Sequence, residues 1–135
     1  MERLFVDTSA WYALANKKAA RHKEVKRAIA EWEGRLCTTD YIFDELVTLI
    51  RYRVGYAPAV EVGEVLQDSG TCLLVRVEDQ DIRDAWDQFV RERDQRNSFT
   101  DCTSFAVMRR LGLTTAAALD DDFVRAGFVV VPEFL

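Results

Sequence analysis

The sequence has little that could bind a soft metal ion or cross-link the chain. Its cysteines, Cys37, Cys72 and Cys102, are far apart and form no CxxC pair. We therefore expect reduced and mostly buried thiols rather than disulfides or a zinc site. His22 is the only histidine, and it lies among lysines and arginines. A metal site in this chain would have to be built from oxygen ligands.

Long apolar runs are also missing. No segment has the length of a membrane-spanning helix, and no charged-then-apolar leader opens the chain, so we expect a cytoplasmic protein that makes no use of a membrane. The 49% of hydrophobic residues, with only two prolines and six glycines, excludes a disordered or fibrous chain. The length predicts one domain over residues 1–135.

The net charge of −5 at pH 7 has the wrong sign for a protein that holds nucleic acid over its whole surface. Two local basic runs, at residues 17–23 and 91–96, are the exceptions. Either run could meet phosphates, although a basic helix face is more often simply solvated.

Strand-like and helical segments alternate along the chain. Short apolar segments predict strands at residues 4–6, 35–38, 72–75, 115–119 and 128–131. Helical spacing predicts helices at 10–16, 20–33, from 40 to the break at 55–58, 59–67, around 82–90, from 98 to Gly112, and a single turn at 121–125. Strands separated by helices favour parallel pairing with right-handed crossovers, so we expect a three-layer α/β/α domain. Ile82, Trp86, Phe89 and Val90 mark the fifth of these helices as amphipathic.

Four acids stand at related positions in this pattern. Asp7 directly follows the first strand, and Asp120 directly follows the fourth apolar segment. Asp101 lies where a helix begins, in a sequence that resembles a capping box with Ser98. Glu45 lies early in the long helix that starts near residue 40. Because parallel sheets place their ligand crevice at the carboxyl ends of the strands, we expect these acids to converge there.

Each acid also has a purely structural explanation. An aspartate at a helix start is a favoured cap worth about 1 kcal/mol, and a single glutamate on a helix is commonly just solvated. Converging carboxylates, however, repel one another and raise at least one pKa, which is costly unless a cation is bound. Mg²⁺ or Mn²⁺ suits such all-oxygen ligation best. We expect the hydroxyls of Thr8 and Ser9 to support the ligands or hold water.

Four segments carry a family resemblance. They are LFVDTSAW at 4–11, FDELV at 43–47, SFTDCTSFA at 98–106 and ALDDDF at 118–123, followed by Gly127-Phe128. In this order they resemble the motif series of the PIN domain, and within it the VapC-type toxins of bacterial and archaeal toxin–antitoxin modules. The similarity runs from Val6 to Phe128.

The resemblance implies a five-stranded parallel sheet of order 3-2-1-4-5 and an Mg²⁺- or Mn²⁺-dependent endoribonuclease acting on RNA. It also implies a homodimer and inhibition by a cognate VapB-type antitoxin. The catalytic residues carried over are Asp7, Glu45, Asp101 and Asp120, with the three aspartates as metal ligands. Thr8, Ser9, Ser104 and Asp122 are the supporting candidates. The family often has Thr or Ser two positions before the fourth acid, whereas this chain has Ala118.

A carboxylate-lined cleft predicts how an antitoxin would bind. A guanidinium can replace the charge of the metal and bind a carboxylate with two hydrogen bonds, so we expect a basic inhibitory segment. We expect the antitoxin to cover apolar surface as well, near Trp11, Tyr12 and Tyr56.

Three other readings compete with the ribonuclease. A haloacid dehalogenase-type hydrolase needs a second aspartate where this chain has Ser9. A phospho-accepting receiver domain needs a lysine at the end of its last strand, and residues 129–132 offer none. The third is a catalytically weak PIN-like RNA-binding or scaffold module, against which the intact set of four acids argues.

Overall fold

A parallel sheet forms the centre of the molecule. The computed structural model describes residues 2–133, and within them the strands are β1 (Leu4–Val6), β2 (Leu36–Thr39), β3 (Cys72–Val75), β4 (Thr115–Ala117) and β5 (Val129–Val131). The strand order is β3-β2-β1-β4-β5, and every pairing is parallel. Both the predicted fold class and the predicted order are confirmed.

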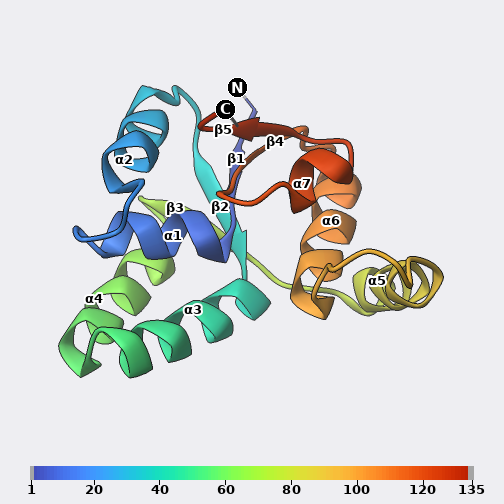
Figure 1. Ribbon diagram of the computed structural model, residues 1–135, viewed down its shortest axis with the longest axis horizontal. Helices are drawn as coiled ribbons and strands as arrows, with labels where there is room; N and C mark the ends of the chain where they lie inside the picture. Colours follow the sequence, from blue (N-terminus) through green and yellow to red (C-terminus); the bar gives the residue numbers. More distant parts are fainter. Residues whose placement is uncertain (1, 134–135) are drawn as a thin grey trace.

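Helices cover both faces of the sheet. They are α1 (Thr8–Ala15), α2 (His22–Glu31), α3 (Asp40–Arg53), α4 (Tyr56–Gln67), α5 (Asp79–Arg91), α6 (Phe99–Leu111) and α7 (Asp122–Arg125). In Figure 1, α1 to α4 lie on one side of the sheet and α5 to α7 on the other. Of the helices in residues 2–133, none is long and apolar enough to cross a lipid bilayer.

Strand β1 lies in the middle of the sheet and in the middle of the core. Leu4, Phe5 and Val6 have no exposed surface, since β2 and β4 flank the strand and helices cover both faces. A strand buried on both faces explains why its sequence is apolar without alternation. The chain leaves the sheet at Asp7, whose N–H still donates to Ala117 O at 2.9 Å.

Strand β4 is shorter than the sequence predicts. The apolar segment 115–119 was expected to be strand throughout, but the strand ends at Ala117. The N–H of Leu119 donates to Ser9 Oγ at 3.0 Å instead of to a neighbouring strand. This side-chain bond turns the backbone out of the ladder, so Asp120 lies three residues beyond the strand rather than directly at its end.

The helix boundaries follow their capping residues. Thr39 accepts from the N–H of Ile42 at 3.1 Å and starts α3. Gly112 has φ of 68° and closes α6 in the left-handed conformation that glycine adopts without strain. Helix α4 starts at Tyr56, before the predicted residue 59, because Pro58 falls in the first turn, where its missing N–H costs nothing.

Helix α5 packs with a face that its apolar pattern does not predict. The amphipathic stripe of Trp86, Phe89 and Val90 should face the core, but these side chains are 55%, 41% and 59% exposed. The buried positions are Asp81, Ala85 and Gln88 instead. The predicted helix is present, but the side chains of Trp86, Phe89 and Val90 that marked it lie on its solvent-facing side.

Pairing with helix α6 explains this orientation. Arg110 donates from Nε to Asp81 Oδ1 at 3.0 Å and from Nη2 to Asp81 Oδ2 at 2.9 Å. Arg109 Nη1 donates to Gln88 Oε1 at 3.2 Å. A buried carboxylate is tolerated when it is paired and hydrogen-bonded in this way, and Ala85 is small enough to let the two helices approach.

Candidate active site

Asp7 is the buried centre of the site. It ends β1 and is the N-cap of α1, and only 4% of it is exposed. Its Oδ2 accepts from Ser9 Oγ at 2.8 Å and from Ser9 N at 3.3 Å. The local sequence therefore fixes this carboxylate at the positive end of a helix, where negative charge is favoured.

Ser9 connects the two central strands. Its hydroxyl donates to Asp7 and accepts from the N–H of Leu119, in the segment that follows β4. The bond anchors the corner at which Ala118 offers no hydroxyl. Ser9, predicted as a supporting residue, thus holds both Asp7 and the approach to Asp120.

Thr8 holds Glu45. Its Oγ1 donates to Glu45 Oε1 at 2.5 Å, which joins the first turn of α1 to the exposed side of α3. A hydrogen bond to an ionised carboxylate is short and comparatively strong. Thr8 is almost fully buried, so it orients one oxygen of a glutamate that is otherwise open to solvent.

Asp101 lies at the start of α6, in the capping box that the sequence predicts. The N–H of Ser98 donates to Asp101 Oδ2 at 2.9 Å, and the N–H of Asp101 donates to Ser98 Oγ at 3.0 Å. One helical turn further, Ser104 is fully buried, and its Oγ has no hydrogen-bond partner among the described residues. A buried polar atom without a partner, one helical turn after Asp101, calls for a water molecule or a ligand.

The three consecutive acids 120–122 have different surroundings. Asp120 Oδ1 accepts from the N–H of Asp122 at 3.3 Å. Asp121 is exposed and forms an ion pair with Arg125. Asp122 is partly buried and pairs with the same arginine. Asp121 points to solvent as predicted, and Asp122 braces Asp120 through its backbone.

The acids act on one another electrostatically. Burial, together with the charges of Asp101 and Asp120 and against the hydrogen bonds from Ser9, raises the pKa of Asp7 to about 7. Burial also raises the pKa of Asp101, with the charges of Asp122 and Glu45 adding to the effect. Partial burial of its carboxylate and the charge of Asp122 raise the pKa of Asp120 to about 6. Shifts of this kind mark a group of carboxylates that favours a cation.

The hydrogen bond to Arg125 has the opposite effect on Asp121, whose pKa it lowers. The contrast separates Asp121 from its neighbour Asp120. Asp121 is both exposed and already paired with a cation, so it is the poorest candidate for a metal ligand in this segment.

The donor atoms fit a hydrated divalent ion. The hydrogen bonds of Asp7 and Asp101 fall on Oδ2, which leaves Oδ1 of each as a candidate ligand. Within residues 2–133, no three or more His, Cys, Asp or Glu side chains are gathered closely enough to enclose an ion. Mg²⁺ typically keeps several waters and takes one or two carboxylates, so these separated, repelling acids suit it better than a metal that needs a full cage of side chains.

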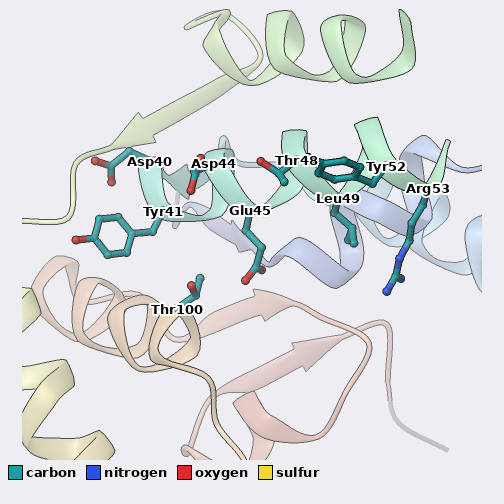
Figure 2. Close-up of a pocket in the computed structure, with 9 residues that line it drawn as sticks. All are labelled: Asp40, Tyr41, Asp44, Glu45, Thr48, Leu49, Tyr52, Arg53 and Thr100. Atoms are coloured by element: carbon teal, nitrogen blue, oxygen red, sulfur yellow. The ribbon is translucent and has the colours of Figure 1, made fainter. Parts of the chain in front are cut away.

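A cleft of about 760 Å³ runs along α3 and includes Glu45. Figure 2 shows Glu45 pointing toward Thr100, at the start of α6. The lining residues are Asp40, Tyr41, Asp44, Glu45, Thr48, Leu49, Tyr52, Arg53 and Thr100. The sequence interpretation picked only Glu45 from this set. Counting in steps of four from Glu45 would have found Tyr41, Leu49 and Arg53, since residues four apart share a helix face.

The expected apolar surface for an antitoxin is only partly present. Tyr56 is 67% exposed, but Trp11 is buried in the core, and Tyr12 is partly buried beneath Arg53.

Comparison with known proteins places these features in a family. The PIN domain model matches residues 4–129. The chain is 40% identical over 131 residues to the 23S rRNA-specific endonuclease VapC20 of Mycobacterium tuberculosis, covering 95% of this chain and 97% of that protein.

Solved structures also match the fold of this chain. The crystal structure of M. tuberculosis VapC20, described as a sarcin–ricin loop cleaving toxin, matches with a TM-score of 0.89 and 38% identity, over 93% of this chain and 96% of that one. VapBC2 from Rickettsia felis, bound to a promoter DNA fragment, matches with a TM-score of 0.70 at 8% identity, over 95% and 96% of the two chains. At so low an identity, the second match shows the fold alone.

Proposed function

This chain belongs to the PIN domain family, and from that membership we propose that it is an endoribonuclease toxin of a type II toxin–antitoxin system, hydrolysing RNA phosphodiester bonds. The observation that carries the proposal is the mutual coupling of acids at the carboxyl edge of the sheet. Asp7 is buried there among the charges of Asp101 and Asp120, and helix capping explains each acid singly but not their mutual repulsion. The likeness to a 23S rRNA-specific endonuclease supplies the reaction class.

We assign Asp7, Asp101 and Asp120 as ligands of Mg²⁺ or Mn²⁺, held directly or through water. When bound, the ion would neutralise charge on the phosphate and assist both the attacking and the leaving oxygen. Ser9 fixes Asp7, and the capping box fixes Asp101, so two of the three carboxylates are already oriented. The contribution of the protein is to position these carboxylates. A hydrolysis without a covalent intermediate depends mainly on such positioning.

Glu45 has a different role. It is held by Thr8 rather than by the aspartates, and it projects into the cleft opposite Thr100 (Figure 2). We assign it to orient the attacking water and accept its proton, or to bind a second ion. Thr8 is then a positioning residue, since it fixes one carboxylate oxygen and leaves the other for the water.

The experiment is a cleavage assay on mixed RNA with Mg²⁺, with Mn²⁺ and with EDTA. We expect cleavage only with a divalent ion, and loss of cleavage in Glu45→Gln protein that still shows the metal-induced rise in Tm. Glu64→Gln, an exposed glutamate on α4 outside this cleft, is the matched control and should cleave normally. Undiminished cleavage by Glu45→Gln protein would remove the proposed role. RNA binding without cleavage by the parent would favour a PIN-like RNA-binding module.

For the substrate, we propose the sarcin–ricin loop of 23S rRNA, because that is what the 38% identical VapC20 structure is described as cleaving. Such a target would place the protein in the cytoplasm. Purified ribosomes and a stem-loop oligonucleotide of this region should be cut at one position. A stem-loop with the same stem and a scrambled loop should remain intact, and equal cutting of both would exclude this specificity.

The partners follow from the same family. We propose a homodimer, and a VapB-type antitoxin that inhibits through a basic segment placed against the carboxylates. Because that contact is electrostatic, inhibition should weaken as salt rises. An antitoxin segment in which every arginine and lysine is replaced should no longer inhibit, and retained inhibition would exclude the electrostatic contact. Size-exclusion chromatography with light scattering tests the dimer.

A further inference from the structure

Helix α3 carries a surface that catalysis does not explain. Tyr52 is 82% exposed, the highest value among the large hydrophobic side chains with described exposure. It lines the same cleft as Glu45. A large aromatic ring left in water at the rim of a cleft contributes little to folding, whereas it offers a flat face to a ligand.

Two rows of side chains wall this cleft along α3. Tyr52 stands eight residues after Asp44, and Arg53 stands eight residues after Glu45, so each pair shares a row of residues four apart. At a rise of about 1.5 Å per residue, Arg53 lies about 12 Å along the helix axis from Glu45. That separation reaches a neighbouring nucleotide of a bound strand rather than the bond being cut.

The two ends of the cleft carry side chains of opposite charge. Asp40 and Asp44 line one end, and Arg53 lines the other. Among the described residues, neither Arg51 nor Arg53 forms an ion pair. Other arginines do, as Arg110 does with Asp81. Phosphates are repelled from the acidic end and attracted to the arginine end, so a strand bound at Glu45 would continue toward Arg53.

Aromatic rings hold both arginines in place. The guanidinium carbon of Arg53 lies 5.9 Å from the centre of the Tyr12 ring, and that of Arg51 lies 5.0 Å from the centre of the Tyr56 ring. Stacking occupies the face of a guanidinium and leaves the N–H groups at its edge free to donate to phosphate. Arginines in a last helical turn also favour the helix dipole, but that effect does not require a neighbouring exposed Tyr52.

We propose that the cleft along α3 is a track for unpaired RNA, in which a base stacks on Tyr52 and an adjacent phosphate binds Arg53. The inference rests on the proposed ribonuclease function and adds the two side chains that seat the strand beside the cleaved bond. Stacking platforms combined with basic side chains are the recurring way in which proteins bind unpaired nucleotides. The strand runs from the cleaved bond at Glu45 along α3 toward its end at Arg53.

Steady-state cleavage of a labelled single-stranded RNA tests Tyr52. Stacking of one base on an aromatic ring is worth about 1–3 kcal/mol, or about 5- to 150-fold in affinity. We therefore expect Tyr52→Ala to raise KM at least about fivefold with a much smaller change in kcat, and Tyr52→Phe to restore the parent KM. Trp86→Ala is the matched control, because Trp86 is also a strongly exposed aromatic but lies on α5, outside this cleft.

Salt dependence tests Arg53. Each phosphate contact on a single strand contributes about 0.7 to the slope of log affinity against log salt. RNA binding followed by fluorescence anisotropy in EDTA should therefore show a slope lower by about 0.7 for Arg53→Ala, with no change for Arg27→Ala. Arg27 is also exposed but pairs with Glu31 on α2.

The outcomes separate this inference from the function it rests on. No cleavage by the parent in Mg²⁺ or Mn²⁺ would reject the ribonuclease, while the binding assay in EDTA would still measure the track. Normal cleavage with an unchanged KM for Tyr52→Ala would reject the track alone. The track is also rejected if Tyr52→Ala weakens only antitoxin binding or only self-association, since the surface then belongs to a protein partner.

Discussion

Replacing Asp7 with asparagine should stabilise the metal-free protein, although it removes a residue of the proposed site. Asparagine keeps the helix cap almost unchanged and cannot ionise. Burial together with the neighbouring acids raises the pKa of Asp7 from 3.8 to about 7. The difference is more than a thousandfold in proton affinity, which is about 4 kcal/mol at about 1.4 kcal/mol per tenfold.

The effect must depend on pH in a defined direction. Native Asp7 keeps its proton up to about pH 7, whereas in the unfolded chain it releases the proton near pH 3.8. Its contribution to stability is therefore complete below pH 3.8 and is lost as the pH rises to about 7. The advantage of Asp7→Asn over the parent should be small at pH 4 and should reach about 4 kcal/mol at pH 8, or about 14 °C in Tm.

Metal should narrow this difference at pH 8. An ion bound only to the native parent stabilises it by about 2.7 kcal/mol at one hundred times its Kd, and Asp7→Asn should lose most of that response. The assay is thermal unfolding at pH 4 and pH 8, in EDTA and in Mg²⁺, with Asp121→Asn as control because that exposed acid already pairs with Arg125. A variant less stable than the parent in EDTA at pH 8, or one with the full metal-induced shift, would refute the reasoning.

Three further predictions concern other parts of the molecule. Single asparagine replacements should slow RNA cleavage in the order Asp120, then Asp122, then Asp121 with almost no effect, and a gel assay with greater loss from Asp121→Asn would overturn the assignment. Asp81→Ala should cost about 2 kcal/mol in urea unfolding, less than for a fully buried pair because Arg110 remains partly hydrated; an unchanged midpoint would contradict this. Phe123→Ala should cost about 3–5 kcal/mol in the same assay, since the ring is fully buried among other aromatics; a loss below about 1 kcal/mol would show that the core refills the space.

Local signals were enough to predict the fold. Doubly buried strands are apolar without alternation, and strands separated by helices permit little besides a parallel sheet. The strand order β3-β2-β1-β4-β5 followed from the family resemblance, and it is confirmed. The capping box of Ser98 and Asp101 was readable because both partners lie within four residues. Where a single helix or turn contains the whole interaction, the sequence determines it.

Features that depend on distant partners were not predictable in the same way. The buried face of α5 is set by Arg109 and Arg110, more than twenty residues away in the sequence, so the hydrophobic pattern alone does not identify that face. The end of β4 is set by Ser9, which is 110 residues distant. Both are hydrogen bonds between polar side chains or backbone groups that no periodicity records.

The candidate site also combines features set by the local sequence with features set by contacts between distant segments. The positions of Asp7 and Asp101 follow from strand ends and caps, and their catalytic roles stay predictions. The bond from Thr8 to Glu45 joins α1 to α3, and the cleft needs Thr100 of α6 as its opposite wall. Neither is visible until the helices are packed.

The exposed Trp86 on the solvent-facing side of α5 allows binding to that surface to be followed by intrinsic fluorescence. Trp86 is 55% exposed and stacks beside Phe89, whereas Trp11 is only 3% exposed. An indole in water emits at longer wavelength than a buried one and is quenched by dissolved iodide. In a protein with Trp11 and Trp32 changed to phenylalanine, fluorescence would come from Trp86 alone. Whatever covers α5 would then shift the emission to shorter wavelength without any attached label, while a strand lying along α3 would leave the spectrum unchanged.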